Sequence, residues 1–121
     1  MDVSGMNERI RVLIYEPKRP PYDRWIDNRL DTLRNYVGGG IEMFEPVHLD
    51  TPAVLVCNRD GKNTVPPLPA NRFLLDKDGA AYDLIVGTFL IAGKGDEELT
   101  SLTADQIREF REAATCGDLP W

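Results

Sequence analysis

The most apolar stretch of the chain is too short to cross a membrane and is not continuously apolar. Leu84–Ala92 spans nine residues and is interrupted by Gly87 and Thr88. A membrane-spanning helix needs about 20 apolar residues, whereas a buried strand needs roughly four to eight. The stretch therefore predicts the central strand of a sheet, expected to run from Tyr82 to Gly93, with a turn of helix as the alternative for its first four residues. No membrane partner is expected.

The size and composition of the chain predict one globular domain. It has 121 residues, of which 42% are hydrophobic and 28% are charged, and a domain of that size buries about two-thirds of its unfolded surface. We expect a single domain over residues 1–121, with flexible ends at 1–7 and 116–121. The first residues are polar and lack the apolar segment of a signal peptide, so the expected location is the cytoplasm.

Short apolar segments separated by prolines and glycines predict the remaining elements. Apolar residues spaced at i, i+3 and i+7 predict a helix over Leu30–Val37, with Asp27 or Asn28 as its N-cap and Gly38 at its end. Thr103-Ala-Asp-Gln106 fits a capping box that begins a second helix. Further strands are predicted over residues 9–16, 22–26, 41–47 and 52–58, and residues 71–75 are predicted to form a short strand or a helical turn.

These elements predict an α+β fold. We expect a single compact domain with a mixed or antiparallel sheet of about five strands, and with the two helices packed on one face of that sheet.

The charge of the chain disfavours a nucleic-acid partner. The net charge is −6. Residues 1–40 hold seven Lys/Arg against six Asp/Glu, a net of +1, and residues 41–121 hold seven against fourteen, a net of −7. Proteins that bind nucleic acids usually carry a basic face. No direct nucleic-acid binding is therefore expected, although a local patch at Lys18, Arg19 and Arg24 remains open.

The residues that usually carry metal or catalytic chemistry are few and scattered. The cysteines, Cys57 and Cys116, form no C-x-x-C pair, and His48 is the only histidine. A zinc site needs four clustered ligands, and a catalytic dyad needs a further group to orient it. We predict two free thiols, no metal, no cofactor and no catalytic residues.

Three short polar segments are candidates for a ligand site. One follows a buried strand, one follows a proline-rich loop, and one interrupts the most apolar strand. Amides and guanidinium groups beside glycine recognise anions and carboxylates. The alternative is that each Asn-Arg pair caps a turn and forms a salt bridge with an acidic neighbour. The candidate residues are Asn58, Arg59, Asn71, Arg72, Gly87 and Thr88.

The order of several short motifs resembles a known family over about residues 8 to 115. The family consists of small proteins known only as a domain of unknown function, common in bacteriophages and conjugative elements. The motifs are Glu16-Pro17, Val37-Gly-Gly, Cys57-Asn58 with Asp60-Gly61-Lys62, Asn71-Arg72, Tyr82-Asp83 with Gly87-Thr88-Phe89, and Ser101-Leu102-Thr103 before the last helix.

The resemblance implies a mobile-element setting inside a host bacterial cell. Small non-enzymatic proteins of such elements often inhibit a host defence protein or sequester a nucleotide signal. We therefore expect a binding protein whose partner is a host protein or a small anionic ligand such as a nucleotide, and homo-oligomers remain possible. Two alternatives stay open, namely a small enzyme that acts on a nucleotide or nucleic acid and a structural subunit of a larger assembly.

Overall fold

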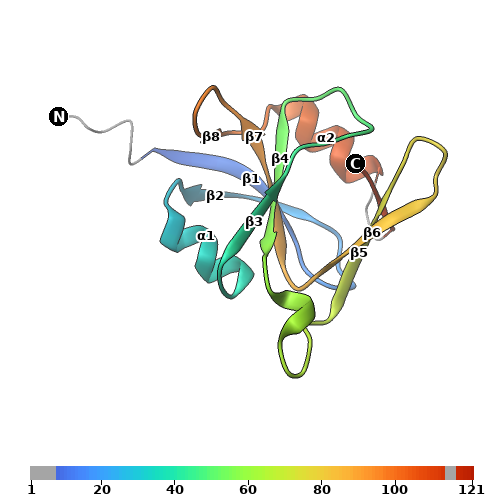
Figure 1. The fold of residues 1–121 in the computed structure, drawn as a ribbon. Helices are drawn as coiled ribbons and strands as arrows, with labels where there is room; N and C mark the ends of the chain where they lie inside the picture. Colours follow the sequence, from blue (N-terminus) through green and yellow to red (C-terminus); the bar gives the residue numbers. More distant parts are fainter. Residues whose placement is uncertain (1–7, 114–116) are drawn as a thin grey trace.

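The computed structural model describes residues 8–113 and 117–121, which form two sheets and two helices (Figure 1). The fold is α+β, as predicted. The helices are α1 (Leu30–Val37) and α2 (Ala104–Ala113), and a short 3-10 helix covers Gly61–Asn63. The strands are β1 (Arg9–Tyr15), β2 (Tyr22–Asp27), β3 (Ile41–Phe44), β4 (Ala53–Asn58), β5 (Ala70–Leu75), β6 (Ala81–Val86), β7 (Phe89–Lys94), β8 (Leu99–Thr100) and β9 (Leu119–Pro120).

The larger sheet is antiparallel and holds most of the core. Its strands follow the order β2-β1-β7-β4-β3, and β8 pairs with β7. The central strands β1, β7 and β4 are apolar at successive positions because both faces of the sheet are covered. This arrangement leaves β2 and β3 as the edges of the sheet among the described residues.

The predicted central strand is two strands in different sheets, so the prediction of one strand from Tyr82 to Gly93 is wrong. Gly87 turns the chain between β6 and β7. Its φ is +73°, a conformation that glycine adopts easily. A Cβ atom there would also lie 2.7 Å from Leu68 Cδ1. The corner at Gly87 sends β6 into the smaller sheet, which raises the strand number above the predicted five.

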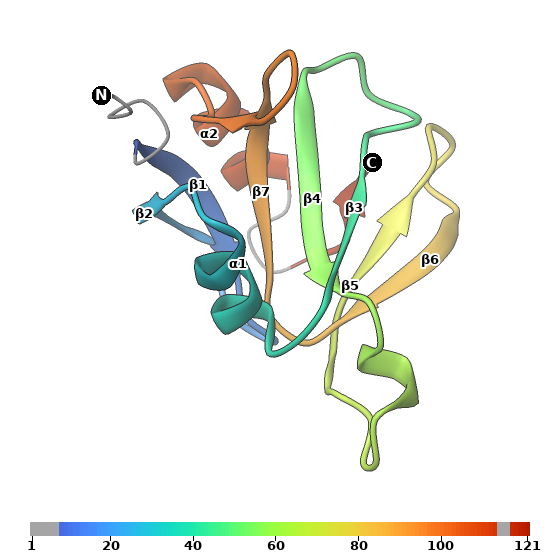
Figure 2. The ribbon, with the colours of Figure 1, turned by 60° about the vertical axis from the view of Figure 1, so that its left-hand side comes forward.

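The two helices cover opposite faces of the larger sheet (Figure 2), so the prediction that they share one face is wrong. Leu33 of α1 packs in the same cluster as Val54, whereas Phe110 of α2 packs in the same cluster as Leu55. Neighbouring residues of a strand point to opposite faces. Because β4 is apolar on both faces, each face needs its own cover.

The smaller sheet has the order β6-β5-β9, with β9 parallel to β5. It includes Leu119–Pro120, which lies within the segment predicted to be flexible. Trp121 is 1% exposed. Its N–H donates to Leu75 O (3.1 Å), and its carbonyl oxygen accepts from the N–H groups of Val47 (2.6 Å) and His48 (2.8 Å). Residues 1–7 and 116, also predicted to be flexible, lie outside the described part.

The caps of the two helices agree in part with those predicted from the sequence. The capping box of α2 is confirmed, because Thr103 Oγ1 accepts from the Gln106 N–H (3.1 Å) and Gln106 Oε1 accepts from the Thr103 N–H (2.9 Å). Gly38 ends α1 with φ of +86°. The predicted N-cap of α1 is wrong, since β2 extends through Asp27 and Arg29 occupies the cap position without a side-chain hydrogen bond.

Candidate functional site

Asn71 joins three parts of the backbone at one end of the larger sheet. Its Nδ2 atom donates to Tyr15 O (2.9 Å) and to Gly87 O (2.8 Å). These bonds tie the beginning of β5 to the end of β1 and to the corner between β6 and β7. The close neighbour that requires glycine at position 87 is Leu68 of the same chain. Asn71 and Gly87 therefore hold the two sheets together.

Arg72 is 2% exposed and its guanidinium is engaged by the protein itself. Nη1 donates to Asn71 Oδ1 (2.7 Å), and Nη2 donates to Arg19 O (2.5 Å) in the loop between β1 and β2. The guanidinium carbon lies 5.5 Å from the centre of the Tyr15 ring, within the range of a cation–π interaction. This arrangement fastens the β1–β2 loop to the smaller sheet.

Asn58 and Arg59 lie at the end of β4, beside the turn that follows α1. Asn58 Nδ2 donates to Val37 O (3.1 Å), and Asn58 Oδ1 accepts from the Asp60 N–H (2.8 Å). The Asn58 side chain thus caps the end of α1. Arg59 is exposed, and its guanidinium lies against Gly40, where a Cβ atom would be 2.9 Å from Arg59 Nη2.

A small pocket opens between the end of β4, strand β3 and strand β6. Its volume is about 180 Å³, below the roughly 300–1,000 Å³ typical of small-molecule sites. Of the six candidate residues only Asn58 and Arg59 line it, and Thr88 is half-buried outside it. Lys62 reaches across the pocket to Asp83, with 3.0 Å between Nζ and Oδ1. The pocket suits one side chain better than a whole nucleotide.

Cys57 lines the same pocket, and the structure predicts that its thiol is inert. Burial, with Glu42 and Asp83 nearby, raises the pKa of Cys57 to about 12, and the thiolate is the reactive form. In a Cys116→Ser background, iodoacetamide at pH 7.5 should leave native Cys57 unmodified and should alkylate it after unfolding in urea. Equal rates of alkylation in the two states, measured by mass spectrometry, would contradict this.

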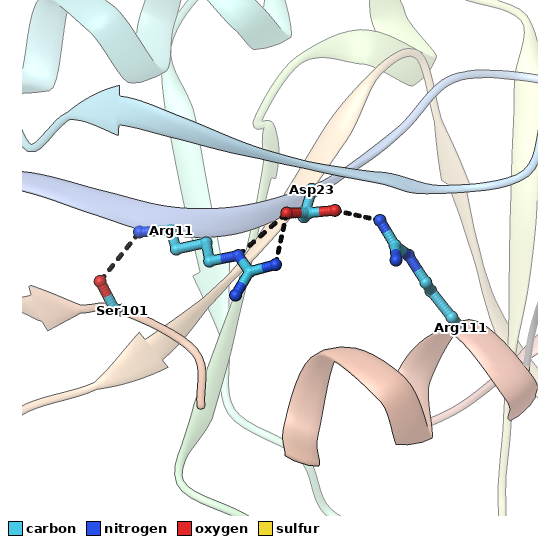
Figure 3. A network of polar contacts seen from close by, with 4 residues as sticks. All are labelled: Arg11, Asp23, Ser101 and Arg111. Carbon is cyan, nitrogen blue, oxygen red and sulfur yellow. Dashed lines mark hydrogen bonds and ion pairs between the residues drawn. The ribbon is translucent and has the colours of Figure 1, made fainter. Parts of the chain in front are cut away.

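A polar network on the face of α2 was not predicted from the sequence. Arg11 on β1 holds the Asp23 carboxylate of β2 through two nitrogens, with Nε–Oδ2 of 2.9 Å and Nη2–Oδ2 of 2.8 Å. Arg111 of α2 binds the other oxygen of Asp23 (Figure 3). The contact between Arg111 and Asp23 joins residues 88 positions apart, and neither residue belongs to a recognisable motif. The network fixes α2 against the edge of the larger sheet.

The network predicts an acid-sensitive contribution to stability. The hydrogen bond from Arg11, together with the charges of Arg11 and Arg111, lowers the pKa of Asp23. A lowered native pKa stabilises the fold above the unfolded pKa of about 3.9, and this stability is lost as the pH falls through the native pKa.

Asp23→Asn should therefore cost about 1 to 2 kcal/mol at pH 7, and the cost should shrink in urea melts at pH 3. Asp78→Asn, which removes a carboxylate from an exposed turn, is the control and should have little effect at either pH. A cost for Asp23→Asn that is the same at both pH values would refute the role of its charge.

Beside this network, β2 carries an exposed aromatic residue. The Trp25 side chain lies on the same face as Asp23 and is 52% exposed. Its strand partner on β1 is Arg11, and Arg9 Nη2 donates to Trp25 O (2.8 Å). Tryptophan and arginine are the residues most enriched at the centres of protein interfaces. This edge is the second candidate site.

The comparisons with known proteins identify the family. A family model described as a domain of unknown function (DUF3846) matches residues 10–115. The chain belongs to the DUF3846 family. The match runs from the second residue of β1 through all of α2 and leaves out only β9, so the pocket and the β2 edge both lie within the DUF3846 domain. Comparisons with curated proteins and with solved structures found no match.

Two further findings concern membranes and metals. No helix in the described ranges is long and apolar enough to cross a bilayer. Within residues 8–113 and 117–121, no group of three or more His, Cys, Asp or Glu side chains is placed to hold a metal ion.

Proposed function

We propose that the protein is a non-enzymatic binding protein of a phage or conjugative element that occupies a host protein, in the manner of a counter-defence inhibitor. The observation that carries the proposal is the β2 edge, where Trp25 is half exposed among arginine side chains. An open sheet edge can pair with another chain, and tryptophan and arginine are the residue types enriched at interface centres. The mobile-element setting rests on the motif resemblance alone.

The geometry of the predicted candidate residues favours a protein partner over a nucleotide. The pocket beside Asn58 and Arg59 has about 180 Å³, which is small for a nucleotide. Arg72, the other candidate for anion binding, is enclosed by Asn71, Arg19 and Tyr15. The β2 edge, in contrast, is accessible and carries the residue types of an interface.

The test is capture of the partner from the host cell. Tagged protein is expressed in its host and purified, and native mass spectrometry gives the mass and stoichiometry of whatever accompanies it. We expect one protein partner at a fixed ratio, lost from Trp25→Ala and retained by Met43→Ala. Met43 is a matched control because it is 46% exposed on the opposite edge strand, β3.

Two results would contradict the proposal. One is a partner that Trp25→Ala retains as fully as the natural protein does. The other is a small molecule that is consumed in excess over the protein, because turnover is a property of an enzyme and not of a stoichiometric binder.

A further inference from the structure

We infer that the partner adds a strand to β2, and that this strand carries a carboxylate residue beside an aromatic one. The inference rests on the proposed function and specifies the chemistry of the same edge. Addition of an extended segment to an open sheet edge is a common mode of protein recognition, in which main-chain hydrogen bonds supply affinity and alternate side chains supply specificity.

The two edges of the larger sheet differ in how well they are protected. Edge strands are usually kept short or interrupted by proline, bulges or charges, since an open edge pairs with other chains. β3 has four residues and is followed by Glu45 and Pro46. β2 follows Pro20 and Pro21 and three of its six residues are charged, but it contains no proline and pairs with β1 in an unbroken register. The β2 edge therefore keeps the regularity that strand addition requires.

The hydrogen bonds of Arg11 show which groups β2 turns outward. Arg11 N donates to Ser101 Oγ (2.9 Å; Figure 3). Arg11 O accepts from the Leu102 N–H (2.9 Å), so the backbone of Arg11 faces away from β2. Residues opposite each other in an antiparallel pair either exchange both hydrogen bonds or exchange neither. Trp25, opposite Arg11, must therefore turn its N–H and C=O to the outer edge, where the C=O also accepts from Arg9 Nη2 (2.8 Å).

The side chains of β2 define what an added strand would meet. Trp25 lies on the α2 face, whereas Arg24 lies on the α1 face, where its guanidinium carbon is 5.4 Å from the centre of the Tyr22 ring. Aromatic pairs and pairs of opposite charge stabilise neighbouring strands. An aromatic residue opposite Trp25 and a carboxylate opposite Arg24 would satisfy both positions, and these two residues must be adjacent in sequence.

Pairing of β2 with a second copy of this chain is disfavoured by its own charges. Opposite residues in an added strand lie on the same face. Two antiparallel registers would overlap most of β2 with the β2 strand of a second copy. In one register Arg24 lies opposite Arg24, and in the other Asp23 lies opposite Asp27. Like charges directly opposite each other are destabilising. The occupant is therefore a different chain.

Synthetic ten-residue peptides test the inference. Each has a central triplet, Glu-Phe-Glu, between alternating threonine and valine residues, so that a glutamate faces Arg24 in either strand direction. Binding is followed by the amide resonances of β2 during titration. N-methylation of the phenylalanine nitrogen should weaken binding about tenfold or more, because it removes a main-chain donor at the position opposite Trp25.

A charge exchange between protein and peptide is the second arm. A Lys-Phe-Lys peptide should bind the natural protein about fivefold more weakly than the Glu-Phe-Glu peptide does, and Arg24→Glu should reverse that preference. Arg34→Glu on α1, an exposed position away from the edge, makes the same change in charge and should leave the preference unaltered.

The results separate this inference from the proposed function. Shifts confined to β2, sensitive both to N-methylation and to the exchange of charge, support strand addition. Binding that ignores either change overturns the inference, as does absence of binding by all the peptides. If the Trp25-dependent partner is captured while no peptide binds, strand addition fails and the proposed function stands.

Discussion

Arg72→Ala should destabilise the protein by about 3 to 5 kcal/mol. The substitution removes a large buried side chain and with it two hydrogen bonds, one to Asn71 Oδ1 and one to Arg19 O. A void of that size typically costs several kcal/mol, and the acceptors left behind in a partly buried site add to the cost. Because a domain is stable by only about 5–15 kcal/mol, urea melts should show a large fall in the midpoint.

Arg59→Ala is the matched control for that experiment. Arg59 follows an asparagine, as Arg72 does, but its side chain is exposed, and its ion pair with Asp60 is long at 3.7 Å. Its loss should change stability by no more than about 0.5 kcal/mol. If the two variants lose equally little stability, Arg72 does not support the fold, and a role in ligand binding becomes the better explanation.

Trp121→Ala should cost about 3 to 5 kcal/mol, as is usual for loss of a fully buried aromatic side chain. The Trp121 ring lies 5.9 Å from that of Phe110 and belongs to the core between α2 and the smaller sheet. The same substitution at Trp25, which is half exposed, should cost less than about 1 kcal/mol. Thermal melts of the two variants measure the difference.

A small effect of Trp121→Ala, similar to that of Trp25→Ala, would mean that the end of the chain does not belong to the folded core. A cost for Trp25→Ala as large as that expected for Trp121→Ala would instead give Trp25 a structural role and would remove the main support for the β2 edge as an interface.

The sequence predicted the elements that depend on local chemistry. The capping box at Thr103 and the glycine end of α1 are decided by residues within one turn of each other, and both are confirmed. The placement of the elements depends on distant residues. Leu84–Ala92 looks like one strand because both of its halves are apolar. Only the structure shows that Gly87 has a φ of +73° and that Leu68 lies where a Cβ atom at position 87 would be.

The sequence did not decide between the two roles of the candidate residues for the same reason. Asn-Arg pairs are compatible with ligand binding and with capping, and the choice depends on which carbonyl groups lie nearby. The structure places Val37 O next to Asn58, and it places Tyr15 O and Gly87 O next to Asn71. The β2 edge carried no motif, because its exposure follows from strand order and not from local sequence.

Amide hydrogen exchange tests the central claim, that the β2 edge accepts a partner strand, most directly. The protein is measured alone and saturated with the Glu-Phe-Glu peptide. The Trp25 amide, which faces outward in the free protein, should exchange markedly more slowly in the complex, and the amides of β3 should be unchanged. Equal exchange of the Trp25 amide in the two states, or protection that appears at β3 instead, would contradict the account.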